Sequence, residues 1–151
     1  MDADLQHPPE ALPRLLERLW TTGADIVVAS RHVCGGGISD WSLIRRFISW
    51  TATSMATCIL PGTLSKVRDP MSGFFLLRRS VLDTAALNPI GYKILLEVLA
   101  RGNYVRVEEV PFIFDERVKD DSKMGPSTVL KYLAHLMRIS LETGQAAQLT
   151  K

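Results

Sequence analysis

A short apolar run directly follows a helical pattern near the start of this 151-residue chain. The run, DIVVAS at residues 25–30, has the β-branched composition of a strand buried on both faces of a parallel sheet. The segment before it, residues 8–23, has prolines near its first turn, leucines on one face and a glycine at its end, which predicts a helix. A helix that leads into a fully buried strand predicts an α/β fold, a mixed sheet flanked by helices.

Later segments continue this alternation of helices and strands. Periodic apolar positions predict further helices, whereas apolar or alternating runs predict strands. Pro111 indicates that the last predicted strand lies at a sheet edge or contains a bulge. We predict helices at 42–60, 80–87 (capped by Ser80), 91–103 and 128–144, strands at 74–79 and 104–114, and loops at 31–41 and 115–127.

Composition and charge exclude several classes of protein. The net charge is only +2 and the charged residues are mixed along the chain, so we expect no nucleic-acid partner. Cys34 and Cys58 form no C-x-x-C pair, and we interpret both as packing residues rather than as zinc ligands. The longest mostly apolar stretch, residues 47–60, is shorter than the ~20 residues that a membrane-spanning helix needs. The chain as given should therefore be soluble or lie on a membrane surface.

An acidic cluster stands at the first residues of the chain. Asp2, Asp4 and Gln6 alternate, so a strand end or a tight turn could aim all three at one point. Hard cations such as Mg²⁺ or Mn²⁺ take oxygen ligands of this kind, often together with substrate phosphates. Two acids near a terminus are also commonly just solvated, and the D-x-D pattern by itself leaves both interpretations open.

Basic residues occur in loops or near the ends of predicted elements. Arg31 follows the buried strand, Arg45 and Ser49 share one face of a helix, and Arg117 and Lys123 lie in a polar loop. Arginine presents a planar fork that binds phosphate, and lysine adds a point charge. Any one of these residues could be an ordinary surface residue, but together with a metal site they suggest a substrate with more than one phosphate.

The order of five segments resembles the dolichol-phosphate and polyprenol-phosphate mannosyltransferases of glycosyltransferase family 2. The resemblance covers about residues 1–142, and five spaced motifs in one order are specific although each is weak alone. The segments are DADLQHPPE, GADIVVASRHVCGGG, WSLIRRFIS, VRDPMSGFFLLRR, and VEEVPFIFDER with DDSKMG. The resemblance implies a GT-A fold and inverting, metal-dependent transfer of mannose from GDP-mannose to a polyprenyl or dolichyl phosphate.

The resemblance also implies a role for each candidate residue. Asp2, Asp4 and Gln6 match the segment that meets Mg²⁺ or Mn²⁺ and the donor diphosphate. Arg31, and Arg45 with Ser49, match residues that hold the acceptor phosphate, so Asp4, Arg31 and Arg45 are the expected catalytic residues. Arg117 matches the arginine that closes over the donor phosphates, and Lys123 belongs to the same loop. The helices at 42–60 and 128–142 match interfacial helices, with core packing as the alternative, and imply a peripheral position on the cytoplasmic face of the membrane.

The chain departs from the family at its start. The family's D-x-D segment follows a complete nucleotide-binding half, for which this chain has no counterpart before Met1. We therefore interpret residues 1–142 as the C-terminal portion of a GT-A domain and 143–151 as a polar tail. The exposed sheet edge would favour self-association or pairing with the missing half, and we expect the isolated chain to bind nucleotide sugar poorly.

Other interpretations remain open at this point. A related family 2 enzyme could move glucose or another sugar to undecaprenyl phosphate, and the residues do not distinguish these substrates. A non-catalytic remnant that binds a partner or a membrane is a second alternative, although the retained acids and arginines argue against it. A two-metal nuclease or phosphatase would need further carboxylates, and none is well placed near the first six residues.

Overall fold

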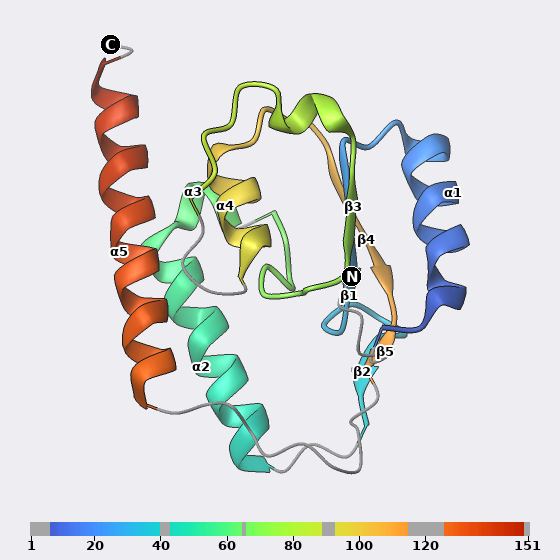
Figure 1. The fold of residues 1–151 in the computed structure, drawn as a ribbon. Helices are drawn as coiled ribbons and strands as arrows, with labels where there is room; N and C mark the ends of the chain where they lie inside the picture. Colours follow the sequence, from blue (N-terminus) through green and yellow to red (C-terminus); the bar gives the residue numbers. More distant parts are fainter. Residues whose placement is uncertain (1–6, 40–42, 65, 89–92, 115–125, 150–151) are drawn as a thin grey trace.

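The computed structural model describes residues 7–39, 43–64, 66–88, 93–114 and 126–149. A central sheet separates one helix from the other helices, so the molecule has a layered arrangement (Figure 1). Its strands lie in the order β3 (Phe75–Leu77), β1 (Ile26–Ser30) and β4 (Val107–Pro111). Strand β1 pairs antiparallel with β3 and parallel with β4. The predicted mixed sheet flanked by helices is confirmed.

Helix α1 (Leu12–Thr22) covers one face of the sheet. A short 3₁₀ turn, η1 (Pro9–Ala11), leads into it, and its buried Leu15 and Leu19 pack in a cluster with residues of β1 and β4. Gly23 ends the helix with φ of 65°, a left-handed conformation that glycine adopts without a steric cost. The prediction of a helix over 8–23 that leads into a buried strand is confirmed, since every residue of β1 is buried.

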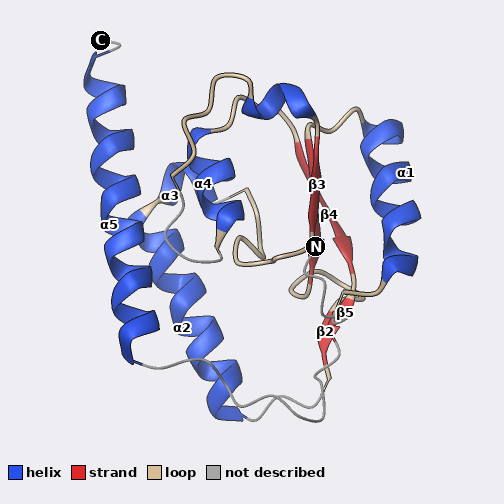
Figure 2. Cartoon of the chain, in the orientation of Figure 1, coloured by secondary structure: helices blue, strands red, loops and turns tan. Residues whose placement is uncertain are grey.

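Four of the described helices lie on the other side of the sheet: α2 (Leu43–Ile59), α3 (Pro61–Leu64), α4 (Ile94–Arg101) and α5 (Pro126–Leu149). Helix α4 packs closest to the sheet, while α2 and α5 run side by side in the outer layer (Figure 2). Among the described helices, none is both long and apolar enough to span a membrane.

A second, smaller sheet extends from the end of the first. It consists of β2 (Gly37–Ile38) and β5 (Ile113–Phe114), which pair in parallel. Strand β4 has β1 as its only partner among the described strands and ends at Pro111, which agrees with the predicted edge position.

Five local predictions need correction. The segment predicted as a loop at 31–41 contains strand β2 (Gly37–Ile38). The segment that begins at Ser80 is a 3₁₀ turn, η2 (Arg79–Leu82), without a side-chain cap. Strand β3 is half-buried and not fully buried, and it is the first strand in the described sheet order. Helix α5 runs to Leu149, past the predicted helix end at residue 144. Cys34 and Cys58 are exposed, not packed inside.

Candidate functional site

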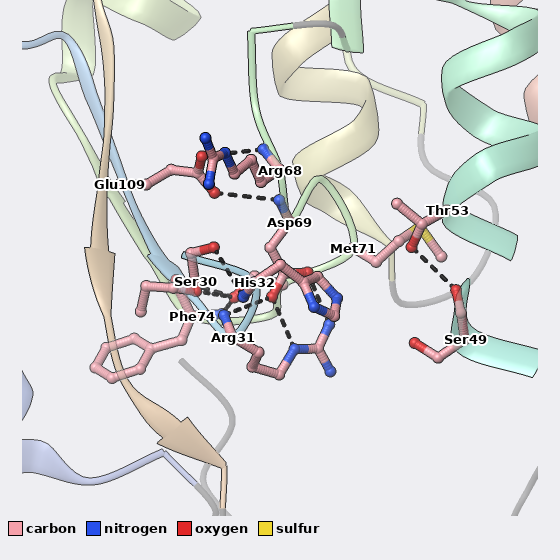
Figure 3. Close-up of polar contacts among 12 residues, drawn as sticks. Ser30, Arg31, His32, Ser49, Thr53, Arg68, Asp69, Met71, Phe74 and Glu109 are labelled. Carbon is pink, nitrogen blue, oxygen red and sulfur yellow. Dashed lines mark hydrogen bonds and ion pairs between the residues drawn. The ribbon is translucent and has the colours of Figure 1, made fainter. Parts of the chain in front are cut away.

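Arg31 follows the last residue of β1 and forms an ion pair with Asp69 (Figure 3). Its Nε donates to Oδ2 at 2.7 Å and its Nη2 donates to Oδ1 at 2.8 Å, while its main-chain N–H donates to Oδ2 at 3.0 Å. The Asp69 side chain is fully buried and that of Arg31 is 10% exposed. A two-point contact of this kind fixes the plane of the guanidinium group. The pair lies at the carboxyl end of β1, where α/β sheets commonly bind ligands.

The Asp69 carboxylate is held in its charged form. Burial raises the pKa of a carboxyl group, but the hydrogen bonds and the positive charge of Arg31 outweigh this effect and keep the pKa of Asp69 below its ordinary value of 3.8. The pair is therefore ionised at neutral pH, and removal of either partner would leave a buried charge uncompensated.

The loop that carries Asp69, residues 68–73, is tied to the strands around it. Both carboxylate oxygens of Glu109 on β4 accept main-chain N–H groups, from Arg68 at 3.0 Å and from Asp69 at 3.1 Å. The Ser72 hydroxyl donates to the carbonyl oxygen of Ala29 on β1 at 2.7 Å. The loop is thus anchored near the carboxyl end of β1 and at the middle of β4.

Two side chains tie the same loop to the helices. The Nζ of Lys93 donates to the carbonyl oxygen of Met71 at 3.2 Å. The hydroxyl of Tyr132 on α5 donates to the carbonyl oxygen of Ala52 on α2 at 2.8 Å and lies 3.6 Å from the Met71 sulfur. The outer helices therefore contact the loop that orients Arg31.

The glycine-rich loop approaches the main chain next to Arg31. A Cβ on Gly36 would lie 2.5 Å from the Ser30 carbonyl oxygen and 3.0 Å from the Arg31 carbonyl carbon, so this position requires glycine. Gly35 has φ of 84°, which also favours glycine. The ring centroid of Phe114 is 5.9 Å from the Arg31 Cζ, within the range of a cation–π contact. The loop therefore shapes the backbone around Arg31.

Ser49 lies on α2 and is half-buried. Its carbonyl oxygen accepts a hydrogen bond from the Thr53 hydroxyl at 3.0 Å, and in Figure 3 it belongs to a separate hydrogen-bonded group from Arg31. Arg45 lies on the same helix, four residues earlier, but its side chain is outside the described part of the structure. The expected grouping of Arg31, Arg45 and Ser49 thus stays a prediction.

The other predicted site residues lie outside the described residues. These are Asp2, Asp4, Gln6, Arg117 and Lys123. Within the described ranges no group of three or more His, Cys, Asp or Glu side chains is placed to hold a metal ion. The metal site and the donor-phosphate contacts remain predictions from the resemblance.

Sequence reasoning missed the two carboxylates that organise this site, Asp69 and Glu109. Both lie in segments on which the resemblance rests, RDPMSG and VEEVP, but no role was assigned to either. They are 38 and 78 positions from Arg31, and no local pattern relates residues at such separations.

Comparisons with known proteins show which family the chain resembles. The model of the family "Glycosyl transferase family 2" matches residues 1–85. The chain is 43% identical to the dolichol-phosphate mannosyltransferase of Pyrococcus furiosus, over all of this chain and 42% of that protein. It is 40% identical to the dolichol-phosphate mannosyltransferase of Saccharomyces cerevisiae, over 92% of this chain and 53% of that protein.

A third relative is named for undecaprenyl phosphate. The chain is 33% identical to the undecaprenyl-phosphate mannosyltransferase of Micrococcus luteus, over 93% of this chain and 58% of that protein. The chain spans about half the length of these relatives. The resemblance that the five segments indicated is confirmed, and the mixed sheet with its flanking helices agrees with a partial GT-A fold.

Proposed function

The chain belongs to glycosyl transferase family 2, and we propose that it forms the acceptor-binding part of an enzyme that transfers mannose to a polyprenyl or dolichyl phosphate. We propose GDP-mannose as the donor. One observation carries the acceptor assignment: Arg31 stands at the carboxyl end of β1 in an orientation that Asp69 fixes.

The charge of the acceptor fits this arrangement. A phosphate monoester carries about −1.5 to −2 at neutral pH, and a guanidinium group matches the spacing of its oxygens. Because Asp69 offsets the positive charge of Arg31, a doubly charged phosphate needs a further cation. We assign that part to Arg45 and a hydrogen bond to Ser49, both from α2.

The reaction that follows needs no separate general base. An ionised phosphate oxygen attacks the anomeric carbon of mannose as the bond to the nucleotide diphosphate breaks, which inverts the configuration at that carbon. Arg31, Arg45 and Ser49 hold the attacking phosphate in line. Arg117 and Lys123 are proposed to contact the donor phosphates. A Mg²⁺ or Mn²⁺ ion on Asp2, Asp4 and Gln6 would stabilise the charge on the leaving diphosphate.

The outer helices support a position on a membrane surface. Helices α2 and α5 pack together, and both expose large apolar side chains. These are Phe47, Trp50 and Met55 on α2, and Leu130, Met137 and Leu141 on α5. We propose that this pair of helices rests on the cytoplasmic face of the membrane and presents the lipid phosphate to Arg31.

The outer edge of β3 is a candidate site for pairing with a strand from another part of the enzyme. Among the described strands β3 pairs only with β1, so its other edge is available to a further strand. We propose that a strand of the nucleotide-binding part of the enzyme pairs there, and a second copy of this chain is the alternative partner.

A transfer assay tests the proposed function. The protein would be expressed with any coding sequence that flanks residues 1–151 and mixed with vesicles containing polyprenyl phosphate, Mg²⁺ or Mn²⁺, and either GDP-mannose or UDP-glucose. We expect mannose transfer, and we expect R31A to lower kcat/KM for the acceptor about 10- to 100-fold, as loss of a hydrogen bond to a charged group implies.

The control is R14A, which removes an exposed arginine from α1. We expect R14A to keep the wild-type kcat/KM. Glucose transfer without mannose transfer would contradict the donor assignment, and full activity of R31A would contradict the acceptor site.

A further inference from the structure

The side chain of Glu109 makes different contacts from that of its neighbour on β4, Glu108. The two carboxylate oxygens of Glu109 accept the consecutive main-chain N–H groups of Arg68 and Asp69 at 3.0 and 3.1 Å. Among the described residues it makes no ion pair, whereas Glu108 pairs with Arg18 and with Arg106. Successive residues of a strand point to opposite faces, so the two glutamates act on different sides of β4.

These hydrogen bonds continue into the proposed acceptor site. Glu109 fixes the peptide on which Asp69 stands, and Asp69 in turn binds Nε, Nη2 and the main-chain N–H of Arg31 (Figure 3). Every link is between 2.7 and 3.1 Å long. A carboxylate that accepts N–H groups forms hydrogen bonds about twice as strong as neutral ones, so it resists rotation of the loop.

We infer that Glu109 is a positioning residue for the acceptor phosphate, acting through Asp69 on the guanidinium group of Arg31. The inference rests on the proposed function and extends it to a residue that touches neither substrate. Strand β4 therefore contributes to the site, because its Glu109 helps to orient Arg31, which follows β1.

The first test compares E109Q with E108Q in the same transfer assay. Glutamine keeps the size of the side chain but replaces one acceptor oxygen with an NH₂ group that opposes a main-chain N–H. We expect E109Q to raise the KM for polyprenyl phosphate about 5- to 10-fold, the equivalent of about one hydrogen bond. The KM for GDP-mannose should stay unchanged, and E108Q should change neither constant although it breaks two ion pairs.

A double-mutant cycle tests whether the effect passes through Arg31. In an R31A background the guanidinium group is absent, so E109Q should have no further effect on the acceptor KM. Additive effects of R31A and E109Q would overturn the inference, because they would show that Glu109 acts on the acceptor by another route.

A measurement without substrate separates this inference from the proposed function. The exchange of the Arg31 Nε proton with solvent, followed by ¹⁵N NMR, reports the hydrogen bond to Asp69. We expect faster exchange in E109Q than in the wild type, an intermediate rate in E109D, which keeps both oxygens on a shorter side chain, and the wild-type rate in E108Q.

The outcomes are distinct. Absence of mannose transfer by the wild type together with fast exchange in E109Q would reject the proposed function and keep the link from Glu109 to Arg31. Equal exchange in the wild type, E109D and E109Q would overturn the inference whether or not mannose is transferred.

Discussion

Asp69 accepts three hydrogen bonds from a single residue, Arg31, which lies 38 positions earlier in the chain. Two come from the guanidinium group and one from the main chain, so the carboxylate holds both the position and the orientation of the arginine. The carboxylate is buried, and its negative charge depends on Arg31 for stabilisation. Stability and acceptor binding should therefore respond together when this pair is broken.

The variant D69N removes the charge of the carboxylate and keeps its size. It leaves the guanidinium group of Arg31 largely buried without its ionic partner, so we expect a loss of up to about 3–5 kcal/mol in the free energy of unfolding. Denaturant unfolding measures this loss. D83N changes an exposed aspartate, and we expect less than about 0.5 kcal/mol for it. Equal unfolding free energies of the two variants would contradict a structural role of the ion pair.

The variant G36A tests the close approach of the glycine-rich loop. The added methyl group would lie 2.5 Å from the Ser30 carbonyl oxygen, a contact that only a shift of the backbone can relieve. We expect the free energy of unfolding to fall by about 1–3 kcal/mol, the usual cost of overpacking, and acceptor binding to weaken. Thermal unfolding and the acceptor KM measure the two effects.

Gly62 provides the matched control for this prediction. It lies in α3, and a Cβ there meets nothing within 4 Å. G62A should leave the free energy of unfolding unchanged or raise it by about 0.5–1 kcal/mol, since alanine has a higher helix propensity than glycine. A destabilisation by G62A as large as that by G36A would show that steric contact is not the cause.

A buried ionic cluster between α4 and α5 should make stability depend on pH. Glu97 is fully buried and binds the Nε2 of His135 at 3.0 Å, Arg138 at 2.8 Å, Arg101 at 2.9 Å and the N–H of Asn88 at 3.1 Å. Burial raises the pKa of this carboxyl group, but its four partners outweigh burial and bring the pKa below the ordinary 4.5.

The sign of the pH dependence follows from that shift. The folded state binds the proton less well than the unfolded state, so the stabilisation is complete well above pH 4.5. It is lost as the pH falls below 4.5 and through the lower pKa of the folded state. E97Q should lower the free energy of unfolding by about 3–5 kcal/mol at pH 7. Its free energy of unfolding should also decrease less than that of the wild type as the pH is lowered. E17Q, an exposed glutamate on α1, should follow the wild-type curve in denaturant unfolding from pH 7 to pH 3. Parallel curves for the wild type and E97Q would refute this assignment.

The two exposed tryptophans distinguish the proposed membrane side from the opposite side. Trp50 on α2 is 64% exposed and Trp20 on α1 is 70% exposed, and the sheet separates their helices (Figure 1). We expect W50S to weaken binding to anionic phospholipid vesicles about 3- to 10-fold, because the indole ring loses its contact with lipid. W20S should bind as the wild type does in a vesicle sedimentation assay. Equal weakening by both variants would argue against a membrane-facing α2.

Some of the fold could be predicted because its signals are local. The helix that ends at Gly23 and the buried strand after it follow from periodicity and composition within about 20 residues, where local patterns are informative. The end of α4 at Gly102 and the edge character of the strand that ends at Pro111 follow from the same kind of signal. Arg31 was a candidate because it follows that buried strand directly.

Other features depend on competition between local preference and packing. Ser80 is a good capping residue, yet the chain forms a 3₁₀ turn there with Arg78 before it and no side-chain cap. Cys34 and Cys58 are apolar enough for a core, but they lie on surfaces that no described element covers. Composition alone carries no information about which face of an element another element will cover.

The sequence by itself determined the α/β class, the first helix with the buried strand after it, and the arginine at the end of that strand, because each is encoded by neighbouring residues. Only the tertiary structure decided that Asp69 orients Arg31 and that Glu109 holds the loop of Asp69. These contacts join residues 38 to 41 positions apart, and they form only when the folded chain brings the loop of Asp69 beside β1 and β4, which pair in parallel.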